Sequence, residues 1–70
     1  GLYTYFRVSD RQKVMVIMNN SNEMRRVDTA QYADTIGDAV TGIEVINGAV
    51  VNIEKPLVVP EKSAVILELR

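Results

Sequence analysis

Residues 43–53, IEVINGAVVNI, carry the strongest fold signal in this chain. Two apolar arms, Ile43–Ile46 and Ala49–Ile53, flank the dipeptide Asn47-Gly48. Asn-Gly is the preferred pair at the centre of a type I′ turn, because both central residues of that turn adopt positive φ angles. The stretch therefore predicts a β-hairpin with its turn at Asn47 and Gly48.

The same period-two alternation extends to the N-terminal part of the chain and predicts strands over Leu2–Val8 and Lys13–Asn19. In Lys13–Asn19 both alternating sets are apolar, which is typical of a central strand covered on both sides. Leu2–Val8 has one face directed into a core. That face carries Leu2, Thr4, Phe6 and Val8, and the opposite face carries Tyr3, Tyr5 and Arg7.

The remaining segments are short. Glu23–Asp28 is rich in charge and predicts an edge strand, and Leu57–Val59, bounded by prolines, predicts another. Ala64–Leu69 predicts the last strand. Its core-facing residues are Val65, Leu67 and Leu69. Turns are expected at Ser9–Gln12, Asn19–Asn22, Thr41-Gly42 and Glu61–Ser63.

Thr29–Ile36 breaks the alternation, and one or two helical turns there would bury Tyr32, Ala33 and Ile36 together. Tyr32 is expected to anchor this crossover. Seven or eight short strands at spacings of about 8–12 residues indicate an all-β antiparallel sandwich or small barrel.

Composition narrows the function. Seventy residues make one domain, and a chain with 47% hydrophobic residues has enough apolar material for a core. Its net charge of −1 argues against a nucleic-acid partner. The longest apolar run, Val14–Met18, is too short to span a membrane, so no membrane partner is expected.

The chain contains few of the residue types that enzymes use for catalysis. The chain has no cysteine and no histidine, so it lacks a thiolate zinc site and the commonest general base, and no metal or cofactor is expected. Its serines all fall in predicted turns. The carboxylates that could form a glycosidase pair lie in turns or on polar faces, without an obvious sugar cleft. They are Asp28, Asp34, Asp38, Glu44 and Glu54. We predict that this chain alone is not an enzyme.

One candidate surface is Tyr3, Tyr5 and Arg7, which share a face of the first strand with the two rings about 6–7 Å apart. Aromatic rings can lie against the apolar face of a sugar, so these residues are candidate glucan contacts. Alternatively, they cover the core or meet a neighbouring domain, since tyrosine suits half-buried positions. Covering the core or meeting a neighbouring domain is favoured over glucan contact.

Four motifs, in the same order along the chain, resemble those of a known family. They are Tyr5-Phe6-Arg7, then Val14-Met15-Val16-Ile17-Met18-Asn19-Asn20, then Asp38-Ala39-Val40-Thr41-Gly42, and finally Leu57-Val58-Val59-Pro60 followed by Ser63-Ala64-Val65-Ile66-Leu67-Glu68-Leu69. With these motifs the chain resembles, over residues 2–70, the C-terminal domain of cyclomaltodextrinase-like and neopullulanase-like enzymes of the α-amylase superfamily.

The resemblance implies a Greek-key β-sandwich that follows a catalytic (β/α)₈ barrel in a parent enzyme acting on α-glucans or cyclodextrins. The catalytic acids of that family lie in the barrel, so the resemblance assigns none to this chain. It also implies a bacterial source with a periplasmic or cell-surface setting. Residues 1–70 are then expected to be a single domain excised from a larger glycoside hydrolase, with Gly1 an expression remnant.

Three hypotheses follow. The first is an accessory domain that packs on the barrel and stabilises it. The second is an α-glucan-binding module that holds substrate near the parent enzyme. The third, much weaker, is a small barrel that binds single-stranded nucleic acid through Tyr3, Tyr5 and Arg7. The acidic second half of the chain argues against the third hypothesis.

Overall fold

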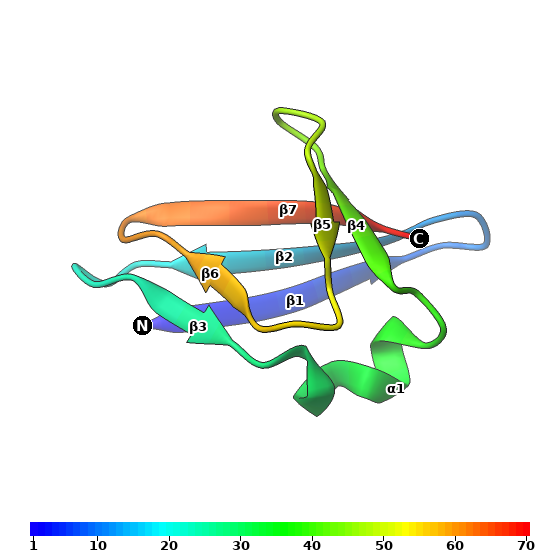
Figure 1. Ribbon diagram of the computed structural model, residues 1–70, viewed down its shortest axis with the longest axis horizontal. Coiled ribbons are helices and arrows are strands. Elements are labelled where there is room, and N and C mark those ends of the chain that lie inside the picture. Colours follow the sequence, from blue (N-terminus) through cyan, green and yellow to red (C-terminus); the bar gives the residue numbers. More distant parts are fainter.

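The computed structural model describes all residues from Gly1 to Arg70 and contains seven strands with one short helical segment (Figure 1). The strands are β1 (Leu2–Val8), β2 (Lys13–Asn19), β3 (Arg25–Val27), β4 (Thr41–Glu44), β5 (Val50–Asn52), β6 (Leu57–Val59) and β7 (Ser63–Leu69). The helical segment consists of a 3₁₀ turn, η1 (Thr29–Tyr32), and one α-helical turn, α1 (Ala33–Ile36). The all-β prediction is confirmed. No helix here has the length and apolarity needed to cross a membrane.

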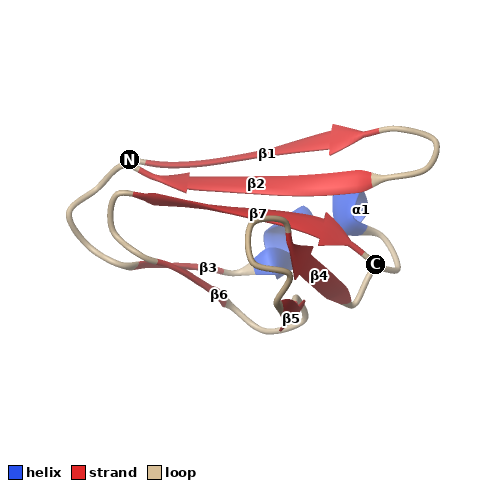
Figure 2. Cartoon of the chain, turned by 90° about the horizontal axis from the view of Figure 1, so that it is seen from above, coloured by secondary structure: helices blue, strands red, loops and turns tan.

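The strands form two sheets, both antiparallel, that lie on either side of the core (Figure 2). The large sheet has the order β1-β2-β7-β4-β5, and the small sheet pairs β3 with β6. Three of the pairs are nested along the chain: β4 with β5, β3 with β6, and β2 with β7. The segment from β2 to β7 is therefore one long hairpin that folds over on itself. As a result β4 also pairs with β7, which joins the β4–β5 pair to the large sheet.

The core lies between the inner face of the large sheet and the small sheet. The large sheet contributes Met15, Ile17 and Leu67, all fully buried, and the small sheet contributes Val27 and Val59. Leu67 and Leu69 are buried and Val65 packs against the core, as the alternation in the last strand predicted. Both strands of the small sheet have a single partner, which confirms that β3 and β6 are edge strands.

The crossover between β3 and β4 is tied to the sandwich at several points. The Asp28 carboxylate accepts a hydrogen bond from the backbone N–H of Ala30 and caps η1. Ile36 is buried in the core. Tyr32 lies edge-on to Phe6 with the ring centroids 5.6 Å apart, which confirms its anchoring role. Ala33 is exposed, so the prediction that it is buried with them was wrong: it lines a hollow beside Ile36 and Ile53 that the chain leaves open.

Asn19, at the end of β2, is a buried polar residue with all of its partners in place. Its amide nitrogen donates to the backbone carbonyls of Glu23, Val59 and Pro60 at 2.7, 3.1 and 3.1 Å. Its carbonyl oxygen accepts from the backbone N–H and the hydroxyl of Ser21. The buried Asn19 side chain thus joins the Asn19–Asn22 turn to the small sheet by hydrogen bonds.

The 43–53 hairpin forms as predicted, with Ile43 paired to Val50, but its turn differs. Only Gly48 has a positive φ, 75°, so the prediction that Asn47 also adopts one was wrong. The backbone N–H of Gly48 donates to the Glu44 carbonyl at 2.7 Å, and that of Glu44 donates to Ala49 at 2.8 Å. The loop therefore has four residues rather than two, and a single left-handed position is enough to close it.

Thr41-Gly42 was expected to be a turn and is instead part of β4. Gly42 is buried between β7 and the segment after β5. A Cβ at this position would lie 3.0 Å from Leu67 Cβ and 3.3 Å from Ile53 Cγ2. The glycine is thus required by the close approach of β4 to the core and not by chain reversal.

Candidate functional site

The outer face of the large sheet, on the side away from the small sheet, is the most distinctive surface of the molecule. Paired residues of antiparallel strands point to the same side of a sheet, so the strand registers define the composition of this face. Three rows run across β1, β2 and β7. They are Tyr3–Met18–Ala64, Tyr5–Val16–Ile66 and Arg7–Val14–Glu68. Ile43 of β4 and Val50 of β5 continue the third row.

Most of this face is apolar and open. Tyr3, Tyr5 and Met18 have exposed fractions of 60%, 50% and 46%. Val16 is only 6% exposed, because its neighbours Tyr5 and Ile66 flank it on the same face. Within this chain β2 is covered on its inner face only, because no second layer lies over Met18, so the chain by itself does not supply the predicted cover on both sides. Contiguous exposed apolar patches of this kind mark interaction sites.

A hollow of about 450 Å³ lies at one end of the outer face. It is lined by Tyr3, Met18 and Ala64 together with four polar residues, Asn19, Asn20, Lys62 and Ser63. Lys62 has a positive φ of 50°, and its ammonium group donates to the Asn20 carbonyl at 2.9 Å. One cationic group and one aromatic ring thus line the hollow together with the apolar side chains of Met18 and Ala64.

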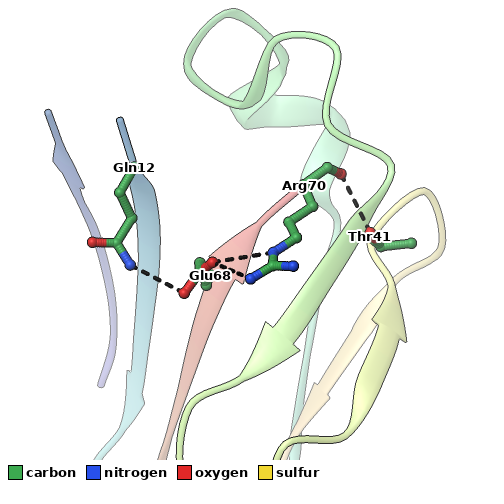
Figure 3. A network of polar contacts seen from close by, with 4 residues as sticks. All are labelled: Gln12, Thr41, Glu68 and Arg70. Carbon is green, nitrogen blue, oxygen red and sulfur yellow. Dashed lines mark hydrogen bonds and ion pairs between the residues drawn. The ribbon is translucent and has the colours of Figure 1, made fainter. Parts of the chain in front are cut away.

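A polar network lies at the opposite end of the face, near the C-terminus (Figure 3). The Glu68 carboxylate accepts from Arg70 Nη2 at 2.7 Å and from Arg70 Nε and Gln12 Nε2, each at 3.1 Å. The hydrogen bond from Arg70 is the main cause of a lowered Glu68 pKa, with smaller contributions from Gln12 and from the positive charge of Arg70. Arg70 in turn accepts from the Thr41 hydroxyl through its backbone carbonyl.

The hydroxyl groups of the serines have structural partners. Ser9 bonds to Gln12, and Ser21 to Asn19 and Glu23. Ser63 begins β7 and donates to the Pro60 carbonyl at 2.7 Å. Each closes a turn, in agreement with the sequence interpretation.

Two of the five candidate carboxylates, Asp28 and Glu44, are used locally, whereas Asp34, Asp38 and Glu54 are exposed and make no side-chain hydrogen bond. Asp28 caps η1, and the Glu44 carboxylate accepts from the backbone N–H of Ile46 at 2.9 Å. No group of three or more carboxylates is arranged to hold a metal ion. A nucleophile with an adjacent base, the minimum for acyl or glycosyl transfer, is not found among these contacts.

Tyr3, Tyr5 and Arg7 share one exposed face, as the alternation in β1 predicted. Sequence reasoning missed the residues that extend this face, namely Val16, Met18, Ile66 and Lys62. The apolar residues at even positions of β2 were the available signal. Their placement beside Tyr3 and Tyr5 depends on the registers with β1 and β7, which no local pattern reveals.

Fold and surface together define a small all-β domain with one open apolar sheet face. The family model of the cyclo-malto-dextrinase C-terminal domain matches residues 1–68, so the chain belongs to that family of accessory domains of α-amylase-family enzymes. Domains of this family are part of larger polypeptides that also contain a catalytic domain. A search of curated proteins found no match.

Proposed function

We propose that this chain is a non-catalytic C-terminal domain that packs on, and stabilises, the catalytic (β/α)₈ barrel of the same polypeptide. The parent enzyme hydrolyses α-glucans or cyclodextrins in a bacterial starch-use setting, at the periplasm or cell surface. The observation that carries the proposal is the open apolar outer face of the large sheet. The family match supports it, because a C-terminal domain of this kind has a catalytic domain to pack against.

Burial of apolar surface at such a domain contact would release enough free energy to stabilise the parent. Interfaces between domains of one chain typically bury about 600–1,500 Å². Apolar area contributes about 25 cal/mol per Å², before the cost of ordering side chains. Burial of the exposed parts of Tyr3, Tyr5 and Met18 would therefore stabilise the parent by roughly several kcal/mol.

The test compares thermal unfolding of the full-length parent and of the 70-residue chain. Met18→Ser removes apolar surface from the outer face, where Met18 is 46% exposed. Val58→Ser is the matched control, because Val58 is 48% exposed but lies on the small sheet. We expect Met18→Ser to lower the melting temperature of the parent more than that of the chain, and Val58→Ser to affect both equally. Equal effects of both variants on the parent would contradict the proposal.

A second candidate function, α-glucan binding, is favoured by one observation. Tyr3 and Tyr5 expose two rings on one face, and Tyr3 also lines a hollow that contains polar groups. The test is a chemical-shift titration of the chain with maltoheptaose and β-cyclodextrin at millimolar concentration. Under the packing proposal we expect no saturable shifts. Saturable shifts at Tyr3, Tyr5 and Arg7 that vanish in a folded Tyr5→Ala variant would establish a glucan-binding module.

The proposal of a non-catalytic domain requires that the chain alone has no hydrolytic activity. Incubation with maltooligosaccharides, cyclodextrins and pullulan is expected to release no reducing sugar. Release that follows the purified chain, and disappears on substitution of one of its Asp or Glu residues, would overturn this part of the proposal.

A further inference from the structure

The charges on the outer face differ in sign from the balance of the whole chain. The chain has nine acidic residues and a net charge of −1, but Glu68 is the only acidic residue among the paired outer-face positions of the large sheet. The other acidic residues lie in turns, on the helical segment or on other faces. The outer face is therefore apolar with a basic rim.

The one carboxylate of the outer face is already neutralised. Glu68 forms the single salt bridge of the chain, with Arg70, at 2.7 Å. Gln12 occupies its other oxygen. Glu68 and Arg70 thus cancel each other's charge and leave no negative group available to a partner.

Two cations of the face have no carboxylate partner. Arg7 lies on β1 at the end of the face near the β1–β2 turn and forms no ion pair or side-chain hydrogen bond. Lys62 lies at the opposite end, beyond Ala64, and its ammonium group contacts only the Asn20 carbonyl. The nearby acidic residues Asp10 and Glu61 are not within salt-bridge distance of either.

The positions of these cations are fixed by the sheet. In the register of β1, β2 and β7, Lys62 lies six residues along the strands and two strands across from Arg7. That corresponds to about 20 Å along the strands and about 10 Å across them. Since this separation exceeds the Debye length of about 8 Å at physiological salt, the two cations act independently on a partner.

We infer that the barrel surface that receives this domain is an apolar patch flanked by two separate carboxylates, one facing Arg7 and the other facing Lys62 at the hollow beside Tyr3. This inference rests on the proposed packing function and adds the chemistry of the partner. The apolar rows between Arg7 and Lys62 supply affinity, and the two rim charges set register and orientation. An acidic partner also explains why this face, on a chain of net negative charge, carries unpaired cations.

The test uses charge reversal in the full-length parent, with the 70-residue chain as reference. Arg7→Glu and Lys62→Glu place a carboxylate where the inference requires a cation. Arg26→Glu is the matched control, because Arg26 is an exposed cation on the small sheet, paired with Val58. Each reversal is expected to lower the melting temperature of the parent by about 1–3 °C at low salt, relative to its effect on the chain.

Two further features identify the interaction. The effects of Arg7→Glu and Lys62→Glu are expected to add in the double variant at physiological salt, and both are expected to shrink in 1 M NaCl. Reversals that change the parent no more than Arg26→Glu would refute the inference. If Met18→Ser still destabilises the parent in that case, the packing proposal stands and only the acidic partner is refuted. If Met18→Ser is also without specific effect, the packing proposal fails as well.

Discussion

The side-chain amide nitrogen of Asn19 donates a hydrogen bond to the backbone carbonyl of Val59 at 3.1 Å, across 40 residues of sequence. This contact joins the end of β2 to β6 and so ties the large sheet to the small one. Asn19 is 2% exposed, and every buried side-chain polar atom in the chain has a hydrogen-bond partner. Because a buried polar group left without a partner is costly, this position tolerates few alternatives.

The first prediction is that Asn19→Ala lowers the free energy of unfolding by about 2–3 kcal/mol, because the buried Val59 carbonyl and the part-buried carbonyls of Glu23 and Pro60 lose their donor. Asn19→Asp is expected to be at least as harmful, since it presents an oxygen to the carbonyls of Val59 and Pro60. Urea unfolding measures both. Asn22→Ala is the control, because Asn22 is exposed in the same turn and makes no side-chain hydrogen bond. A loss in Asn22→Ala equal to that in Asn19→Ala would contradict this account.

The sequence predicted β1 and β2 with the observed bounds, Leu2–Val8 and Lys13–Asn19. It succeeded there because alternation over seven residues is a local consequence of the pleat. It could not predict that Asn19 bonds to Val59, or that Tyr3 lies beside Met18 and Ala64. Those relationships depend on which distant strands pair and in which register, and alternation is equally consistent with several pairings.

The second prediction concerns Gly42, which the sequence placed in a turn. Gly42→Ala is expected to destabilise the chain by about 1–3 kcal/mol, because the added methyl group would lie 3.0 Å from Leu67 Cβ and 3.2 Å from Leu67 Cδ1. Urea unfolding at neutral pH provides the measurement. Gly48→Ala is a useful comparison, since nothing lies within 4 Å of its Cβ position and only its positive φ opposes the substitution. An unchanged midpoint for Gly42→Ala would show that β4 can move away from Leu67.

The third prediction concerns the anchor between the helical segment and β1. Tyr32→Ala is expected to cost about 2–3 kcal/mol, because it removes a half-buried ring that packs edge-on against Phe6. Tyr32→Phe is expected to be close to neutral, since the Tyr32 hydroxyl makes no hydrogen bond within the chain. Thermal unfolding of the two variants separates ring packing from the hydroxyl group. Similar losses in both variants would mean that the hydroxyl, and not the ring, anchors the crossover.

At the candidate site, too, the sequence predicted what depends on one strand and not what depends on the pairing of distant strands. The sequence placed Tyr3, Tyr5 and Arg7 on one exposed face, which needs only the period of one strand. It did not reveal that Lys62 completes that face, because Lys62 reaches it through the β6–β7 turn and the pairing of β7 with β2. The unpaired state of Arg7 was also hidden, since Glu68 is near in the sheet but bonds to Arg70 instead.

The fourth prediction is a pH dependence centred on Glu68. Hydrogen bonds from Arg70 and then Gln12 lower its pKa below the usual 4.5. In an acid titration followed by carboxyl ¹³C shifts, Arg70→Gln should raise the Glu68 pKa toward 4.5, and Gln12→Ala should raise it by less. The reverse order would show that Gln12 is the dominant partner.

The sign of the effect on stability follows from this shift. Because the folded-state pKa lies below the unfolded value, Glu68 stabilises the fold fully above the unfolded pKa, and this contribution is lost as the pH falls through the folded pKa. The effect is small, since the Glu68 side chain is 30% exposed and solvent screens its charge. Glu68→Gln is therefore expected to have a flatter decline of the urea midpoint than the wild type between about pH 5 and pH 3. A decline of equal steepness in both proteins would show that the Arg70–Glu68 contact does not contribute to acid sensitivity.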